Sequence, residues 1–386
     1  MTPEQWMRRA LKLAAHGRGW VNPNPLVGAV LIKDGKLISE GFHQRYGGPH
    51  AEAVVLEKAG SEARGADLYA NVEPCVSHPG KRTPPCADQI IQSGVRRVFV
   101  AMRDPDTHVN GRGIAQLRAA GIDVQESILA AEAQKLNEIS VKYKTTGKPF
   151  VLLKMAMSAD GKIATRTGNS KYISSPDSLR YAHELRDRYT ALLVGIGTVL
   201  ADDPQLNTRL DCPGHDPVRV LLDAQGRLPL EAKLLQSKSS AKTILATTDA
   251  LSKAKEEALL HRGVEIWKLP IVTNNIGAQH AAPLQSGQID LHELADRLGK
   301  AGLDSLLVEG GSTVTASFLQ TGLVDKITFV IAPMLIGGQT APSPIGGLGI
   351  EKIEDAFRLK DISLRALGQD IVYEAYLDYT GLEDSS

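Results

Sequence analysis

The order of apolar and polar positions predicts that the first third of the chain is an alternating α/β segment. Helical periodicity covers residues 3–17, 51–59, 86–93 and 113–120, whereas short apolar runs at 28–32, 68–72, 97–101 and 122–124 are typical of strands. Helices and strands that alternate in this way indicate a sheet covered by helices on both faces.

The second part of the chain shows a different pattern of apolar runs. Residues 150–157 are nearly all apolar, as expected of a strand buried on both faces of a parallel sheet. Two strand–glycine–helix units follow, at 191–198 and 305–313. Their glycines would let backbone amides approach a phosphate, although glycines in such turns also serve close packing. Neither unit has the third glycine of G-x-G-x-x-G, so a standard dinucleotide fold is not indicated.

The length and one change of composition predict two domains. A chain of 386 residues is longer than a usual single domain. Residues 141–149 are basic and polar and end in glycine and proline, and we place the boundary within them. The predicted domains are residues 1–146 and 147–386.

Charge and composition limit the partners. The chain has 44 Lys and Arg residues in total and 44 Asp and Glu residues. It therefore lacks the net positive charge expected of a protein that binds a nucleic-acid backbone. We expect a small-molecule partner and no nucleic acid. The absence of a long apolar run or a signal-peptide pattern predicts no membrane association and a cytoplasmic location. Three cysteines provide no disulfide framework, and Cys212 is expected to be a free thiol.

Four residues of the first domain indicate a zinc site. One imidazole (His50) and two thiolates (Cys75 and Cys86) can hold zinc while its fourth position stays open for water, which then becomes nucleophilic near neutral pH. Glu52 could take the water proton and pass it to a leaving amine. H-x-E followed by P-C-x-x-C is the signature of zinc deaminases. Here ten residues, not two, separate the cysteines.

Two simpler interpretations of these residues stay open. Cys75 and Cys86 could be ordinary buried thiols beside a surface histidine. A purely structural zinc would need a fourth ligand such as His78, and it would leave Glu52 without a role.

In the second domain, Lys154 interrupts an apolar strand and Asp202 follows the first glycine unit. Both could serve a site, although Lys154 could also lie along the sheet with its amine in solvent.

Motifs in both halves resemble those of the bifunctional deaminase–reductases of bacterial riboflavin biosynthesis, in the family's order. In the first half they are residues 22–28, 50–52, 73–75, 83–86 and 104–105. In the second half they are residues 158–164, 197–204 and 308–311. The resemblance covers almost the whole chain, and the combination of motifs is specific.

The resemblance implies a fold and two reactions. It implies an N-terminal cytidine-deaminase-like three-layer α/β/α domain (1–146) and a dihydrofolate-reductase-like α/β domain (147–386). The first would use one zinc ion to deaminate 2,5-diamino-6-(5-phosphoribosylamino)pyrimidin-4(3H)-one. The second would use NADPH to reduce the ribosyl chain of the product to 5-amino-6-(5-phosphoribitylamino)uracil. We also expect a homo-oligomer, a dimer or larger.

The resemblance also assigns roles to individual residues. In the first domain, the residues expected to hold pyrimidine and ribose phosphate are Asn24, His43, His78, Lys81 and Asp104. In the second, the expected cofactor contacts are Ala156, Tyr172, Thr198, Asp202, Gly311, Ser312, Thr313, Val314, Thr315, Ala316 and Ser317. The expected substrate contacts there are Ser170, Arg186, Leu206, Arg209 and Glu309. Lys154, Asp202 and Glu309 are candidates for proton transfer during reduction, and the sequence does not rank them.

The chain departs from the family pattern in two places. The loop between Cys75 and Cys86 is longer, which should cost little closure entropy and leave zinc binding intact. Asp106 stands where the family commonly has asparagine, and its negative charge would disfavour a phosphorylated substrate unless it points away.

Two rival functions are a deaminase of nucleosides, bases or tRNA with an accessory domain, and a zinc-stabilised binding module without catalysis.

Overall fold

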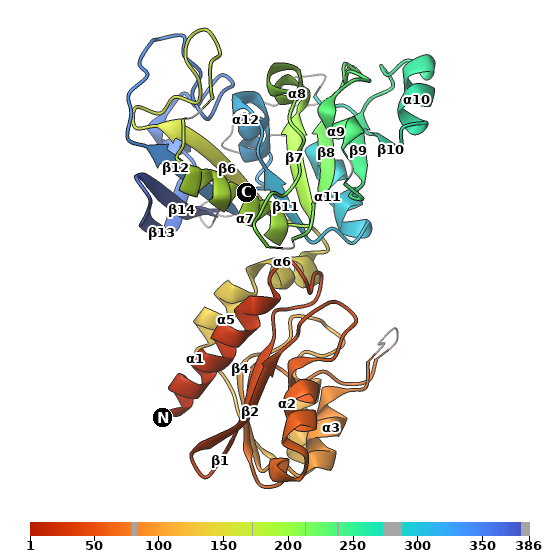
Figure 1. Cartoon of the computed structure of the whole chain (residues 1–386), viewed down its shortest axis with the longest axis vertical. Coiled ribbons are helices and arrows are strands. Elements are labelled where there is room, and N and C mark those ends of the chain that lie inside the picture. The colour runs from red at the N-terminus through yellow and green to blue at the C-terminus, as the bar shows by residue number, and fades with distance from the viewer. Residues whose placement is uncertain (79–82, 172, 213, 238, 273–287, 380–386) are drawn as a thin grey trace. The chain divides into compact units, whose positions relative to one another are not determined.

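The computed structural model forms two compact units, Met1–Lys148 and Pro149–Ser386 (Figure 1). It describes residues 1–78, 83–171, 173–212, 214–237, 239–272 and 288–379. Two predicted site residues, Lys81 and Tyr172, lie outside these ranges. No helix within the described ranges combines the length and apolar character needed to cross a membrane.

The first unit is built on a five-stranded sheet of order β2-β1-β3-β4-β5. Its strands are β1 (Gly28–Lys33), β2 (Lys36–Phe42), β3 (Asp67–Val72), β4 (Arg97–Met102) and β5 (Asp123–Gln125). β1 pairs antiparallel with β2 and β3, whereas β4 runs parallel to β3 and β5. Every residue of β3 is buried, because helices cover both faces of the sheet.

Among the described residues of this unit, six α-helices complete the fold. They are α1 (Pro3–Ala14), α2 (Ala51–Ala59), α3 (Cys86–Ser93), α4 (Arg112–Ala119), α5 (Ala130–Leu136) and α6 (Glu138–Thr146). Helices α1 and α5 pack together on one face of the sheet, while α2 packs against β1 and β2 and contacts α3 on the other. The result is a three-layer α/β/α unit whose core includes the fully buried Met7, Leu31 and Ile90.

The second unit is built on a nine-stranded sheet of order β10-β9-β8-β7-β11-β6-β12-β14-β13. Its strands are β6 (Phe150–Ser158), β7 (Ala191–Gly195), β8 (Val218–Leu222), β9 (Thr243–Thr247), β10 (Val264–Lys268), β11 (Ser305–Val308), β12 (Lys326–Ala332), β13 (Arg358–Leu367) and β14 (Asp370–Asp378). The strands from β10 to β12 in this order are parallel, and β14 is antiparallel to both neighbours.

Helices connect the parallel strands of this sheet. They are α7 (Pro176–Arg188), α8 (Ile196–Asp202), α9 (Lys233–Gln236), α10 (Lys253–Leu260), α11 (Leu291–Lys300) and α12 (Ser312–Gln320). β7 leads directly into α8, and its neighbour β11 leads through Glu309 and two glycines into α12. Because both strands are parallel, these two turns meet at one edge of the sheet, where α/β folds bind ligands.

The helices and strands predicted from periodicity are confirmed to within a few residues at their ends. The basic stretch at 141–149 proves to be mostly helical, since α6 continues to Thr146. Gly147 then takes a left-handed conformation with φ of 70°, and its N–H bonds to the carbonyl of Tyr143. This segment therefore belongs to the packed structure of the first unit.

Candidate active sites

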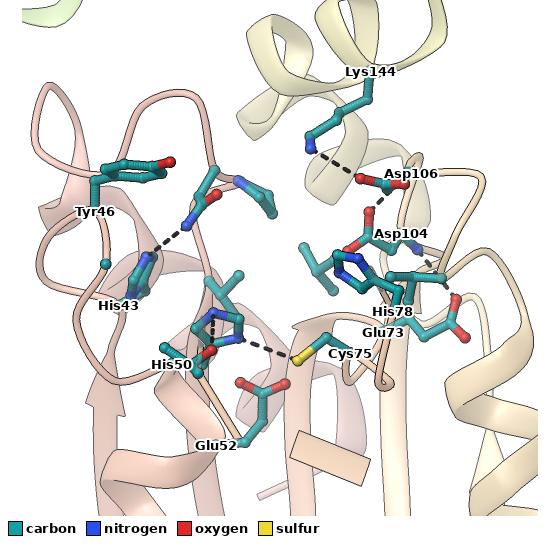
Figure 2. Close-up of a pocket in the computed structure, with 17 residues that line it drawn as sticks. His43, Tyr46, His50, Glu52, Glu73, Cys75, His78, Asp104, Asp106 and Lys144 are labelled. Carbon is teal, nitrogen blue, oxygen red and sulfur yellow. Dashed lines mark hydrogen bonds and ion pairs between the residues drawn. The ribbon is translucent and has the colours of Figure 1, made fainter. Parts of the chain in front are cut away.

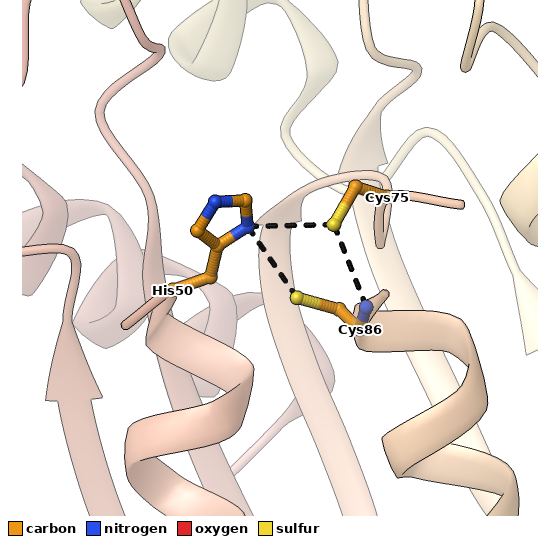
Figure 3. A group of neighbouring side chains, drawn as sticks. All are labelled: His50, Cys75 and Cys86. Carbon is orange, nitrogen blue, oxygen red and sulfur yellow. Dashed lines mark hydrogen bonds between the residues drawn. The ribbon is translucent and has the colours of Figure 1, made fainter. Parts of the chain in front are cut away.

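The predicted metal ligands meet where two helices begin and one strand ends (Figure 3). His50 is the N-cap residue of α2, Cys86 is the first residue of α3, and Cys75 follows the end of β3. The Cys86 backbone N–H lies 3.5 Å from the Cys75 Sγ. Both cysteines are buried, and His50 is half-buried.

The three donor atoms have the spacing that one zinc ion requires. The His50 Nδ1 lies 3.4 Å from the sulfur of Cys75 and 3.4 Å from that of Cys86. All three atoms lie within 4.8 Å of one another. Zn–N and Zn–S bonds of about 2.0 and 2.3 Å in a tetrahedron place neighbouring ligand atoms roughly 3.5 Å apart. The donor set and its geometry therefore fit zinc.

Glu52 lies in the first turn of α2, beside this group (Figure 2). Its side chain is buried, and its Oε2 has no hydrogen-bond partner among the described residues. Burial, with a smaller effect of Cys75, raises the pKa of the Glu52 carboxyl to about 7. A buried carboxyl oxygen without a partner fits a group that exchanges a proton with a bound water.

A cavity of about 170 Å³ opens above these residues (Figure 2). Its lining includes four residues predicted from the resemblance, Asn24, His43, His78 and Asp104. His43 donates from Nδ1 to the carbonyl of Pro49 (2.9 Å), which leaves Nε2 to accept the amide N–H of Asn24 (3.3 Å). The His43 ring also lies edge-on to that of His50, with 5.1 Å between centroids.

The opposite wall of the cavity is organised by Glu73. Its buried carboxylate accepts four backbone N–H groups, from Asp104 (3.2 Å), Gly111 (2.8 Å), Gly113 (2.9 Å) and Ile114 (3.1 Å). Gly113 must be glycine because an added Cβ would lie 2.0 Å from the carbonyl oxygen of Pro74. Glu73 immediately precedes Pro74 and Cys75. Its hydrogen bonds therefore connect the segment that carries Cys75 to the loop that carries Asp104.

Asp104 and Asp106 have opposite electrostatic settings. Burial raises the pKa of Asp104 to about 6. Asp106 lies against two cationic or donor groups, the Lys144 Nζ of α6 (2.9 Å) and the His108 Nδ1 (2.9 Å). Burial by itself would raise the pKa of Asp106. Hydrogen bonds from the His108 backbone and from Lys144 outweigh burial and lower this pKa well below its usual range. The extra negative charge noted in the sequence is therefore compensated by Lys144.

The second unit contains a cleft of about 840 Å³ at the ends of β6, β7 and β11. Most of the residues predicted for catalysis, cofactor contact or substrate contact in this unit line it, namely Lys154, Ala156, Ser170, Arg186, Thr198, Asp202, Leu206, Glu309, Gly311, Ser312, Thr313, Val314 and Ser317. Thr315 and Ala316 lie on another side of α12, where Thr315 Oγ1 is 3.4 Å from the Met155 sulfur. Arg209 is exposed, outside the residues that line the cleft, and donates to the Asn207 side chain (2.6 Å).

The glycines of the two strand–helix turns fall into two pairs, one required for packing and one not. A Cβ added at Gly195 or at Gly310 would come within 2.7 or 2.6 Å of the Val314 side chain, so both glycines are needed for close packing of α12. A Cβ at Gly197 or Gly311 would meet nothing within 4 Å. These two positions therefore leave backbone open to the cleft, as contact with a phosphate group requires.

Two of the residues that line the cleft form an ion pair. Arg186 of α7 donates through Nη2 to the Glu309 Oε2 (2.5 Å) and through Nη1 to the carbonyl of Asn207 (3.2 Å). Burial would raise the pKa of Glu309, but Arg186 and Lys154 outweigh it and the pKa is lowered. Burial lowers the pKa of the Lys154 ammonium, against the attraction of Glu309. Glu309 is thus held as a carboxylate beside an amine disposed to release its proton.

The folds and sites together define the class of this protein: a deaminase unit with a metal site, followed by a reductase unit. Residues 1–102 match the family described as the cytidine and deoxycytidylate deaminase zinc-binding region. Residues 149–373 match the RibD C-terminal domain.

Similarity to characterised proteins extends over nearly the whole chain. The riboflavin biosynthesis protein RibD of Actinobacillus pleuropneumoniae is 41% identical over 380 residues, which are 98% of this chain and 95% of that protein. The solved structure of Acinetobacter baumannii RibD is 34% identical, covers 97% of this chain and 98% of its own, and has a TM-score of 0.84. A Thermotoga maritima diaminohydroxyphosphoribosylaminopyrimidine deaminase/5-amino-6-(5-phosphoribosylamino)uracil reductase is 35% identical, with coverage of 97% and 98% and a TM-score of 0.78.

The chain therefore belongs to the RibD family, and it is a bifunctional riboflavin biosynthesis enzyme with deaminase and reductase activities. The predicted fold class is confirmed by these matches. The sequence analysis missed several residues that line the deaminase cavity, among them Tyr46, Thr83 and Lys144. Thr83 was visible only as part of the motif that precedes Cys86, and Lys144 only as one basic residue of the boundary stretch.

Proposed function

We propose that the chain hydrolyses the ring amine of 2,5-diamino-6-(5-phosphoribosylamino)pyrimidin-4(3H)-one and then reduces the ribosyl group of the product with NADPH. The observation that carries the first step is the meeting of His50, Cys75 and Cys86 beside the buried Glu52 at the bottom of a cavity. For the second step, the support is the cleft at β7 and β11 with backbone open at Gly197 and Gly311.

In the deaminase, three residues would hold the metal and a fourth would move protons. Zinc held by His50, Cys75 and Cys86 would supply a Lewis acid with one position left for water. Glu52 would take a proton from the attacking water and deliver it to the amine, so that ammonia leaves as oxygen is added to the ring carbon. Asn24 and Asp104 face the same cavity and orient the pyrimidine by hydrogen bonds.

In the reductase, the polar residues of the cleft divide the work. NADPH, bound along Gly311 and the first turn of α12, would supply the hydride for the ribosyl carbon. Arg186 holds Glu309 in place and supplies a guanidinium suited to phosphate or hydroxyl oxygens. As the ribose ring opens, its oxygen must receive a proton.

We assign that proton to Lys154 rather than to the other two candidates. Lys154 lines the cleft, and its burial favours release of the ammonium proton. Glu309 is kept ionised by Arg186, and Asp202 is exposed at the end of α8. The aspartate instead stands where it can accept hydrogen bonds from the cofactor.

The two reactions can be tested separately in the full-length chain. We expect Glu52→Gln to abolish ammonia release while zinc content and reduction of the deaminated substrate persist. Lys154→Met should abolish NADPH oxidation while ammonia release persists. Continued deamination by Glu52→Gln, or reduction at an unchanged rate by Lys154→Met, would contradict the roles assigned here.

The cofactor assignments have their own measurements. We expect elemental analysis to find one zinc ion per chain, and chelation to remove ammonia release but not NADPH oxidation. A preference for NADPH over NADH should appear as a lower KM. RNA binding that weakens strongly with salt would instead favour a nucleic-acid deaminase.

A further inference from the structure

In the loop after α8, two residues other than glycine have an unfavourable backbone conformation. Asp203 has φ of 42° and Leu206 has φ of 52°, both in the left-handed region. Leu206 is also buried, at 2% exposure. A bulky residue in this region costs free energy and persists only where its surroundings hold it there. The loop from Leu206 to Arg209 is therefore held in place by contacts outside itself.

Helix α7 supplies two of these contacts from one face. The Arg209 backbone N–H donates to the Nδ1 of His183 (3.2 Å), and the Asn207 carbonyl accepts from Arg186 (3.2 Å). His183 and Arg186 are three residues apart in α7, so their side chains lie on the same side of the helix. A third contact comes from the Asp216 carboxylate, which accepts the Thr208 N–H (2.7 Å).

The contact from His183 requires an unprotonated ring nitrogen. Nδ1 accepts a hydrogen bond here, so the imidazole must be neutral and carry its proton on Nε2. Burial, followed by the positive charges of Arg186 and Arg209, lowers the pKa of His183 to about 4. The acceptor is consequently present throughout the neutral range.

We propose that His183 is a positioning residue of the reductase, which holds the Leu206–Arg209 loop in the shape that binds the phosphorylated substrate. The inference rests on the proposed function and on the family resemblance, which implies that Leu206 and Arg209 contact that substrate; Leu206 itself lines the cleft. His183 stands outside the lining of the cleft, so it acts through the loop rather than by touching the reacting atoms. Arg186 joins the same loop to Glu309 inside the cleft, so the shape of the loop and the position of the ion pair are linked.

Two substitutions separate the hydrogen bond from the volume of the side chain. His183→Leu removes the acceptor, whereas His183→Asn can place its amide oxygen near the position of Nδ1. In the full chain with zinc and NADPH, we expect His183→Leu to raise the KM for the deaminated substrate about tenfold or more, with little change in kcat or in the KM for NADPH. His183→Asn should restore most of that KM. Glu184→Ala, an exposed neighbour on α7, is the matched control and should behave as wild type.

The outcomes distinguish this inference from the proposed function. Ammonia release by the other unit and the thermal unfolding of each variant report on whether the chain is folded. Equal KM values for folded His183→Leu, His183→Asn and wild type would overturn the inference while leaving the proposed reduction in place. A KM that rises equally in both variants would also overturn it, because the hydrogen bond would then not matter. Wild-type chain that fails to oxidise NADPH with the deaminated substrate would overturn the proposed function itself.

Discussion

The Nε2 of His50 lies 3.4 Å from the hydroxyl oxygen of Thr83, while the Nδ1 of the same ring lies 3.4 Å from each of the two cysteine sulfurs. The imidazole therefore presents one nitrogen to the metal site and the other to a hydroxyl group. Metal-ligating histidines commonly donate their second N–H to a neighbouring acceptor, which fixes the orientation of the ring. Thr83 stands in the long loop between the cysteines, so this loop contributes to the site beyond its two sulfurs.

We expect Thr83→Val to weaken zinc binding about tenfold, because the isosteric side chain cannot accept the His50 N–H. Thr83→Ser keeps the hydroxyl and should bind zinc as wild type does. Competition with a chromogenic chelator measures the affinity directly, without reference to activity. Equal zinc affinities for the valine and serine variants would show that the contact has no orienting function.

The Lys144–Asp106 pair predicts a rescue within the deaminase cavity. Lys144→Ala removes the lysine partner of the negatively charged Asp106 in the cavity that we propose holds the phosphorylated substrate, so the deaminase KM should rise about tenfold or more. Adding Asp106→Asn removes that charge and should return the KM towards wild type, which a double-mutant cycle quantifies. Lys142→Ala serves as the control on the same helix. If the double variant stays as impaired as Lys144→Ala, Lys144 acts on the substrate directly.

Asp104 predicts a pH-dependent change in stability. Its pKa in the folded chain is about 6, above the usual 3.8, so ionisation as the pH rises through 6 opposes folding. Asp104→Asn should therefore stabilise the first unit at pH 8, by up to about 3 kcal/mol. Below about pH 4 the carboxyl is protonated in both states and the difference should vanish. Denaturant unfolding at the two pH values measures this, and a difference independent of pH would contradict it.

The glycines of the reductase cleft predict two unlike effects of the same substitution. Gly310→Ala forces a Cβ to within 2.6 Å of Val314, and overpacking of this kind costs about 1–3 kcal/mol of unfolding free energy. Adding Val314→Ala should recover part of that loss. Gly197→Ala meets no atom within 4 Å, so stability should be retained while the KM for NADPH rises. Thermal unfolding and steady-state kinetics of the three variants separate packing from cofactor contact.

Much of the candidate chemistry was predictable from the chain alone. His50, Glu52, Cys75 and Cys86 were proposed from residue type and order, because zinc chemistry restricts the ligands to a few side chains, and the structure brings His50, Cys75 and Cys86 together. The strands and helices that carry them were also predicted, since apolar periodicity reflects burial directly. The order of the two units was predicted from their motifs, and the family matches confirm that order.

The remaining features depend on contacts between distant segments. In the sequence, Lys144 is one basic residue of the stretch that contains the predicted domain boundary, and only the fold of α6 brings its amine to Asp106, 38 residues earlier. In the sequence, Gly195 and Gly310 look the same as Gly197 and Gly311. Only the position of Val314 shows that the first two are needed for close packing, whereas the other two leave the backbone open. The proposed ranking of Lys154, Asp202 and Glu309 likewise rests on burial and the Arg186 ion pair. Local patterns encode residue chemistry and burial, whereas charge compensation, close approach and pKa arise from neighbours that only tertiary folding brings together.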